Sequence, residues 1–120
     1  MSSEIIDLLK QSVGQLIEKY FEKKPIFGEL QTKPINLKKN SLRGFITITG
    51  KDFAGSVAVD LSTGFYKTFK QLQRWQPDFT DGDICYELAN EVAGFIKKNF
   101  LEIGYPCDIG IPQIITLREL

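Results

Sequence analysis

The stretch that decides the fold is Asp83-Ile-Cys-Tyr-Glu87-Leu-Ala-Asn90-Glu-Val-Ala-Gly94. Residues three and four apart share a face of a helix, so this spacing predicts a polar side and an apolar side. The predicted polar face consists of Asp83, Glu87, Asn90, Glu91, Gly94 and Lys98, and the apolar face of Ile84, Leu88, Val92, Phe95 and Ile96. Such a polar face is normally only solvated, but an amide near a bare glycine leaves a shallow spot where another protein can dock.

The N-terminal half of the chain is predicted to contain one helix and three strands. Apolar residues recur at helical spacing from Ser2-Ser3 to Lys23-Lys24-Pro25, which indicates a helix of about five turns. Residues 26–32 are predicted to form a strand, followed by a polar loop. The β-rich runs at residues 45–49 and 53–61 flank Gly50-Lys-Asp and predict a hairpin.

The C-terminal half is predicted to be helix, helix and strand. A second helix should begin at the N-cap Ser62, with Phe65, Phe69 and Leu72 on its inner face. The long third helix should end at Gly104, and residues 107–117 should form the last strand. Pro112 has no N–H for a strand ladder, so it implies an edge, a bulge or a bend. This order predicts an α+β fold, a two-layer sandwich of long helices on a mostly antiparallel sheet.

The composition limits the chemistry. The 120 residues are expected to form a single domain, residues 1–120. The 15 basic and 15 acidic residues cancel, which argues against binding to nucleic acid or an anionic membrane. Charges interrupt the first twenty residues, so no signal peptide or membrane-inserted helix is expected and the cytoplasm is the expected location.

The chain has no histidine, which removes the commonest general base and most zinc ligand sets. Cys85 and Cys107 lack metal-ligand spacing and are predicted to be buried, reduced thiols. The acidic loop at residues 77–83 does not have the spacing of a calcium loop. No metal site is therefore predicted.

The run Asp83, Glu87, Asn90 with the downstream Pro112 resembles the pattern of the CheC/CheX/FliY family of chemotaxis phosphatases. In that pattern Asp or Ser is followed after three residues by Glu, after two more by Asn, and later by Pro. The resemblance covers residues 44–115 and includes Gly55-Ser56-Val57 and residues 104–112 in the same order. Because the chain has one copy of the motif, it is similar to single-site CheX members.

The resemblance implies a hydrolase, a phosphatase acting on the aspartyl phosphate of a CheY-like response-regulator receiver domain. Asn90 would orient the attacking water, and Glu87 would dock on a lysine of the receiver. The receiver would supply the divalent metal, so the chain would need no cofactor of its own. A non-catalytic module that binds a response regulator or joins a signalling complex is the alternative, and a structural dimer with a merely solvated helix face is a third possibility.

The remaining residues of the motif carry open alternatives. Asp83 either favours the dipole at the helix start, where Thr80 or Asp81 can cap, or contacts the partner. Gly94 either lets the receiver approach closely or packs tightly against a neighbouring element. Glu91 occupies a position that is often apolar in the family, which would influence the choice of receiver.

Two further expectations follow from the resemblance. Pro112 is expected to shape the strand beneath the long helix and to do no chemistry. The C-terminal strands of the family, two long strands that usually follow the proline segment, are expected to be missing here. Either the sheet is smaller, or its open edge is covered by the first helix, by a loop or by a second copy of the protein, because an uncovered edge invites pairing. A homodimer is expected.

Overall fold

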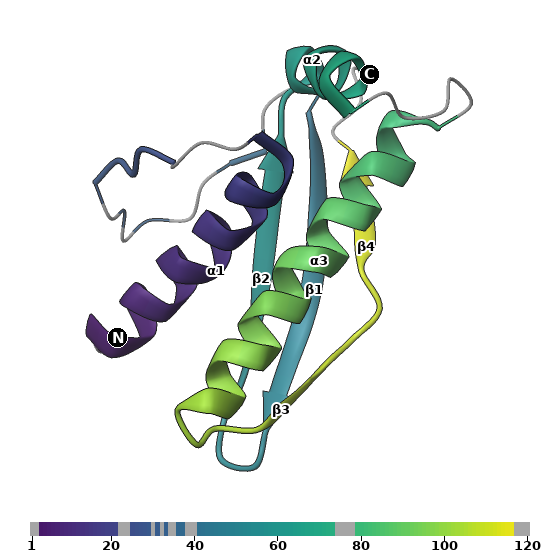
Figure 1. Cartoon of the computed structure of the whole chain (residues 1–120). Coiled ribbons are helices and arrows are strands. Elements are labelled where there is room, and N and C mark those ends of the chain that lie inside the picture. Colours follow the sequence, from purple (N-terminus) through teal and green to yellow (C-terminus); the bar gives the residue numbers. More distant parts are fainter. Residues whose placement is uncertain are drawn as a thin grey trace.

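A computed structural model describes residues 3–21, 25–29, 31, 33, 36–37, 41–73 and 79–116. Its elements are α1 (Ser3–Phe21), β1 (Leu42–Gly50), β2 (Ala54–Leu61), α2 (Thr63–Gln73), α3 (Asp81–Glu102), β3 (Cys107–Ile109) and β4 (Gln113–Thr116). Helix α3 lies along one face of the sheet over β1, and α1 packs beside α3 (Figure 1). This arrangement confirms the predicted α+β fold with helices on an antiparallel sheet.

β1 is the central strand of the sheet. It pairs antiparallel with β2 along its length, from Leu42 opposite Leu61 to Thr49 opposite Ala54. On its other side it pairs antiparallel with β3 and β4. Gly50 N–H donates to the Phe53 carbonyl at 2.8 Å and closes the turn between β1 and β2. The predicted hairpin is thus confirmed.

A bulge at Pro112 divides the predicted last strand into β3 and β4. Residues 110–112 stand opposite only Ile46 and Thr47 of β1, one residue more than an unbroken ladder allows. Gly110 N–H donates to the Thr47 carbonyl at 2.9 Å and keeps the bulge against β1. Pro112 is buried at this point, where its missing N–H removes no ladder hydrogen bond.

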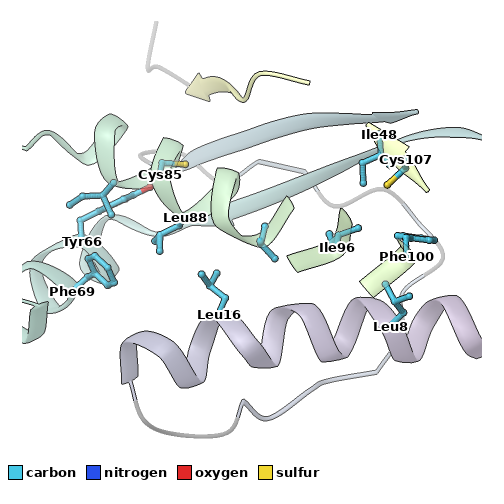
Figure 2. Close-up of a cluster of buried hydrophobic side chains, with 12 residues drawn as sticks. Leu8, Leu16, Ile48, Tyr66, Phe69, Cys85, Leu88, Ile96, Phe100 and Cys107 are labelled. Atoms are coloured by element: carbon cyan, nitrogen blue, oxygen red, sulfur yellow. The ribbon is translucent and has the colours of Figure 1, made fainter. Parts of the chain in front are cut away.

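The hydrophobic core lies between α3, the sheet and α1 (Figure 2). Helix α3 contributes most of it, and its buried apolar residues are Ile84, Cys85, Leu88, Ala89, Val92, Ala93, Ile96 and Phe100. Leu8 and Leu16 of α1 close one side, and Phe69 of α2 is fully buried at one end. Each large apolar side chain buried in this way contributes roughly 1.5–3 kcal/mol. The core therefore holds the apolar face of α3 inward and its polar face outward.

Helix α3 begins and ends where the sequence predicts. Thr80 is its N-cap, and Ile103 is its C-cap. Gly104 follows with a φ of 87°, a left-handed conformation that glycine adopts without strain. Its N–H donates to the carbonyl of Leu101 at 3.0 Å and satisfies one of the last helical acceptors.

The strand predicted at residues 26–32 is wrong, because residues 26–29 and 31 are not part of a strand. Ile26 is 99% exposed, and the ring of Phe27 lies 5.6 Å from the ammonium of Lys10 on α1. The apolar side chains of this segment therefore find no sheet face to cover. Other predicted positions lie outside the described residues, namely Ser2, Lys23, Lys24, Leu30, Thr32, Leu117 and the side chain of Leu72. Within the described parts of the chain, no helix combines the length and apolar character needed to cross a bilayer.

Candidate functional site

The candidate site is the polar face of α3. Glu87, Asn90 and Gly94 are all exposed there, one turn apart. Among the described residues, no hydrogen bond or ion pair occupies the side chain of Glu87 or Asn90. An amide that points outward can donate and accept hydrogen bonds, and a free carboxylate can accept them. The face therefore offers both groups to a partner.

The sheet beneath α3 sets the position of Asn90. Ala89, immediately before it, is fully buried and packs with Ala93 against Ile46 of β1. A Cβ added to Gly44 of β1 would lie 2.6 Å from the Cβ of Ala89. The absence of a side chain at Gly44 thus lets α3 approach the sheet closely at the turn that carries Asn90. The bulge that contains Pro112 lies opposite Ile46 and Thr47, beneath this same turn. That Pro112 shapes the strand there stays a prediction.

Asp83 has an intramolecular role at the start of α3. Its carboxylate accepts a hydrogen bond from Thr80 N–H at 2.9 Å, and the Thr80 hydroxyl accepts one from Asp83 N–H at 3.1 Å. This reciprocal pair is a capping box, which satisfies backbone donors of the first turn. The structure therefore supports the role at the helix start, and contact of Asp83 with a partner stays a prediction.

Glu91 is half-buried and also engaged within the chain. Its carboxylate accepts hydrogen bonds from the ammonium of Lys19 and the hydroxyl of Tyr20, both at the end of α1. Burial, this hydrogen bond and the charges of Glu91 and Glu87 raise the pKa of Tyr20, so its hydroxyl stays a donor. In the structure the Glu91 carboxylate is bound by two residues of α1. Its contact with a partner stays a prediction. The sequence analysis did not predict this pairing. Its only sign in the sequence is that Lys19 and Tyr20, which can both donate hydrogen bonds, stand at the end of the apolar stripe of α1.

Gly94 does not pack against a neighbouring element. A Cβ built at this position would meet no atom within 4 Å. The tight-packing alternative is therefore wrong. Close approach of a partner remains the functional prediction for this glycine.

Gly94→Ala is expected to raise the free energy of unfolding by about 0.5–1 kcal/mol, because alanine restricts the unfolded chain and is the better helix former. Urea denaturation of the variant and the wild type measures the change. Gly64→Ala in α2 is a matched control, since a Cβ there also meets no atom within 4 Å. A loss of stability in Gly94→Ala alone would contradict the open environment of this residue.

The two cysteines are buried and form no disulfide. Burial raises the pKa of both thiols. The hydroxyl of Tyr66 lies beside the Cys85 thiol, a weak partner, and has no stronger one among the described atoms (Figure 2). Burial raises the pKa of this hydroxyl as well. The predicted burial of both thiols is confirmed.

The fold is expected to lose stability as the pH rises from 7 to 10. Cys85, Cys107, Tyr20 and Tyr66 all have raised pKa values in the folded chain, so the unfolded chain releases their protons first. This stability is fully present below about pH 8, where the unfolded groups are still protonated, and falls above it. Urea denaturation across this range measures the decline, and a free energy of unfolding that is flat or rising would contradict the burial of these groups. A chromogenic thiol reagent at pH 8 gives a local check, since it should react slowly until urea is added.

The polar face of α3 has groups that can orient a bound molecule through hydrogen bonds. An amide such as Asn90 can hold a water molecule but does not take a proton from it at neutral pH. Within the described residues, no group of three or more His, Cys, Asp and Glu side chains is placed to hold a metal ion. Glu87 and Asn90, exposed one turn apart, can accept and donate hydrogen bonds to another molecule.

Comparison with known proteins identifies the fold. Neither a protein-family model nor a curated protein matches the chain. Solved structures of chemotaxis proteins do match it, and the two-layer architecture is that of the CheC-like proteins. One match is a CheC-like superfamily protein from Shewanella sp. PV-4, with a TM-score of 0.80 and 22% identity over 97% of this chain and 78% of that one.

CheX structures also match along most of the chain. CheX from Vibrio vulnificus has a TM-score of 0.79 and 18% identity, and the match covers 97% of this chain and 80% of that one. A CheX–CheY–BeF3–Mg complex from Borrelia burgdorferi matches with a TM-score of 0.66 and 17% identity, over 93% of this chain and 76% of that one. The chain thus has the fold of CheC-like and CheX chemotaxis proteins, and the predicted resemblance is confirmed for the fold.

Proposed function

We propose that the chain is a CheX-like phosphatase that hydrolyses the aspartyl phosphate of a CheY-like receiver domain. The observation that carries this proposal is the outward amide of Asn90, with Glu87 one turn before it, on the long helix of a CheX fold. The Borrelia burgdorferi structure, in which a CheX is bound to a CheY, supports a receiver domain as the kind of partner.

In this proposal Asn90 enters the partner's site and orients a water molecule in line with the phosphorus. The water oxygen bonds to phosphorus while the bond from phosphorus to the aspartyl oxygen breaks, which releases inorganic phosphate and restores the carboxylate. The barrier falls because the water is held in the attacking position, not because Asn90 removes its proton. The lysine and the divalent metal of this reaction belong to the receiver.

Glu87 has the second role in the proposal. Its exposed carboxylate pairs with the receiver's lysine and fixes α3 in register. This ion pair gains strength as the two surfaces exclude water. Gly94, one turn beyond Asn90, leaves the partner's backbone room to approach. In this proposal the polar face of α3 docks through Glu87 and orients the attacking water through Asn90. The homodimer expected from the sequence also stays a prediction.

A panel of phosphorylated receiver domains tests the proposal. Each receiver is phosphorylated with a small phosphodonor, the donor is removed, and the decay of the phosphoprotein is followed with and without the chain. Faster decay of at least one receiver is the expected result. If a receiver binds more tightly when phosphorylated but keeps its phosphate, the chain is a non-catalytic binding module and not a phosphatase. A panel without binding or accelerated decay would refute both.

A further inference from the structure

A cluster beside Asn90 joins α1 to the candidate site. It consists of Lys19, Tyr20 and Glu91, and we call it the Glu91 cluster. One carboxylate oxygen of Glu91 accepts from Lys19 and the other from Tyr20. Because Glu91 directly follows Asn90, these hydrogen bonds join the end of α1 to α3 at the turn that carries Asn90.

The core anchors this cluster through Tyr20. The Tyr20 ring makes an edge-on contact with Phe69, with centroids 5.2 Å apart and planes at 61°. Phe69 is fully buried, so it holds the ring firmly. The Tyr20 hydroxyl in turn holds Glu91. Helix α1 therefore reaches the candidate site from a fixed position.

Lys19 gives the cluster an outward positive end. Its side chain is 51% exposed, whereas that of Glu91 is 20% exposed. Its ammonium also lies 5.2 Å from the centroid of the Tyr20 ring, which limits its freedom. The negative charge of Glu91 is thus covered and the positive charge faces solvent. Without Lys19, two carboxylates one turn apart, Glu87 and Glu91, would face the partner.

This charge arrangement suits an anionic partner. The substrate in the proposed function carries a phosphoryl group, which is negatively charged at neutral pH. Two carboxylates at the edge of the face would repel it, whereas a fixed ammonium attracts it and speeds the encounter. Lys19 is therefore expected to strengthen binding of the phosphorylated partner in addition to pairing with Glu91 within the fold.

We propose that the Glu91 cluster makes the end of α1 a second wall of the docking surface. Tyr20 and Glu91 are positioning residues in this inference, and Lys19 contacts the anionic surface around the phosphoryl group of the partner. The inference rests on the proposed function for its partner, but it concerns affinity and not the chemical step. Binding can therefore test it apart from hydrolysis.

The experiment measures the affinity of the chain for a receiver loaded with beryllofluoride, a stable mimic of the phosphoryl group. Lys19→Met is expected to raise the dissociation constant about threefold to tenfold and to weaken its dependence on salt. Tyr20→Phe should weaken binding in the same direction, because it frees one oxygen of Glu91. Lys67→Met is the matched control, since Lys67 is an exposed lysine on α2.

A charge-swapped double variant separates docking from folding. Lys19→Glu and Glu91→Lys are each expected to lower the melting midpoint, and the double variant should recover most of it by restoring the ion pair. Its affinity should stay low, because residue 19 then presents a negative charge to the partner. Recovery of both midpoint and affinity would overturn the inference, as would wild-type affinity in Lys19→Met. A wild-type chain that binds the loaded receiver but hydrolyses no phosphate would refute the proposed function and leave this inference standing.

Discussion

Asn90→Ala is expected to slow receiver dephosphorylation about 100-fold, the loss typical when one orienting group is removed from a reacting centre. The side chain is exposed and has no hydrogen-bond partner among the described residues. Its removal therefore costs the fold little, within about 0.5 kcal/mol for an ordinary surface position. The variant should dephosphorylate the receiver more slowly while it keeps its fold and still binds the receiver.

The decay of a phosphorylated receiver under single-turnover conditions measures this prediction, with the chain in excess and its concentration varied up to saturation so that KM and kcat are both obtained. Glu87→Ala is the matched control on the same face, because it removes a docking contact and leaves the amide in place. We expect Glu87→Ala to raise KM with a smaller change in kcat, and Asn90→Ala to lower kcat. Equal decay rates with the wild type and Asn90→Ala would refute the role of the amide.

The polar face of α3 could be predicted because its cause is local. Helical periodicity places Glu87, Asn90 and Gly94 on one side, and the buried residues between them confirm that side as outward. The helix ends were equally local, since Thr80 and Gly104 act on their own turns. Residues within a few positions of each other in the sequence are enough to predict a helix face and helix ends.

The missed features depend on contacts between distant parts of the chain. Glu91 meets Lys19 and Tyr20 across about seventy residues, so helical periodicity gives no sign of that pairing. Ile26 and Phe27 are residue types that are enriched in strands, but a strand also needs a neighbouring edge and a face to cover. Composition alone therefore could not show that residues 26–29 lie apart from the sheet.

Gly44→Ala is expected to lower the free energy of unfolding by about 1–3 kcal/mol, the usual cost of forcing extra volume into a packed interior. The added Cβ would lie 2.6 Å from the Cβ of Ala89, and Cβ atoms cannot rotate away from a clash. The carbonyl oxygen of Cys85, at 3.5 Å, closes the space further. Helix α3 must therefore move away from β1 at the turn that carries Asn90, so kcat should fall together with stability.

Urea denaturation and receiver dephosphorylation measure the two effects of Gly44→Ala. Gly55→Ala on β2 is the matched control, because Gly55 also lies in a strand and a Cβ there meets no atom within 4 Å. The double variant Gly44→Ala with Ala89→Gly removes the clash and should recover kcat. Its stability should recover only in part, since a glycine inside a helix costs about 1 kcal/mol. A Gly44→Ala chain as stable and active as Gly55→Ala would show that the close approach of α3 to β1 does not set the position of Asn90.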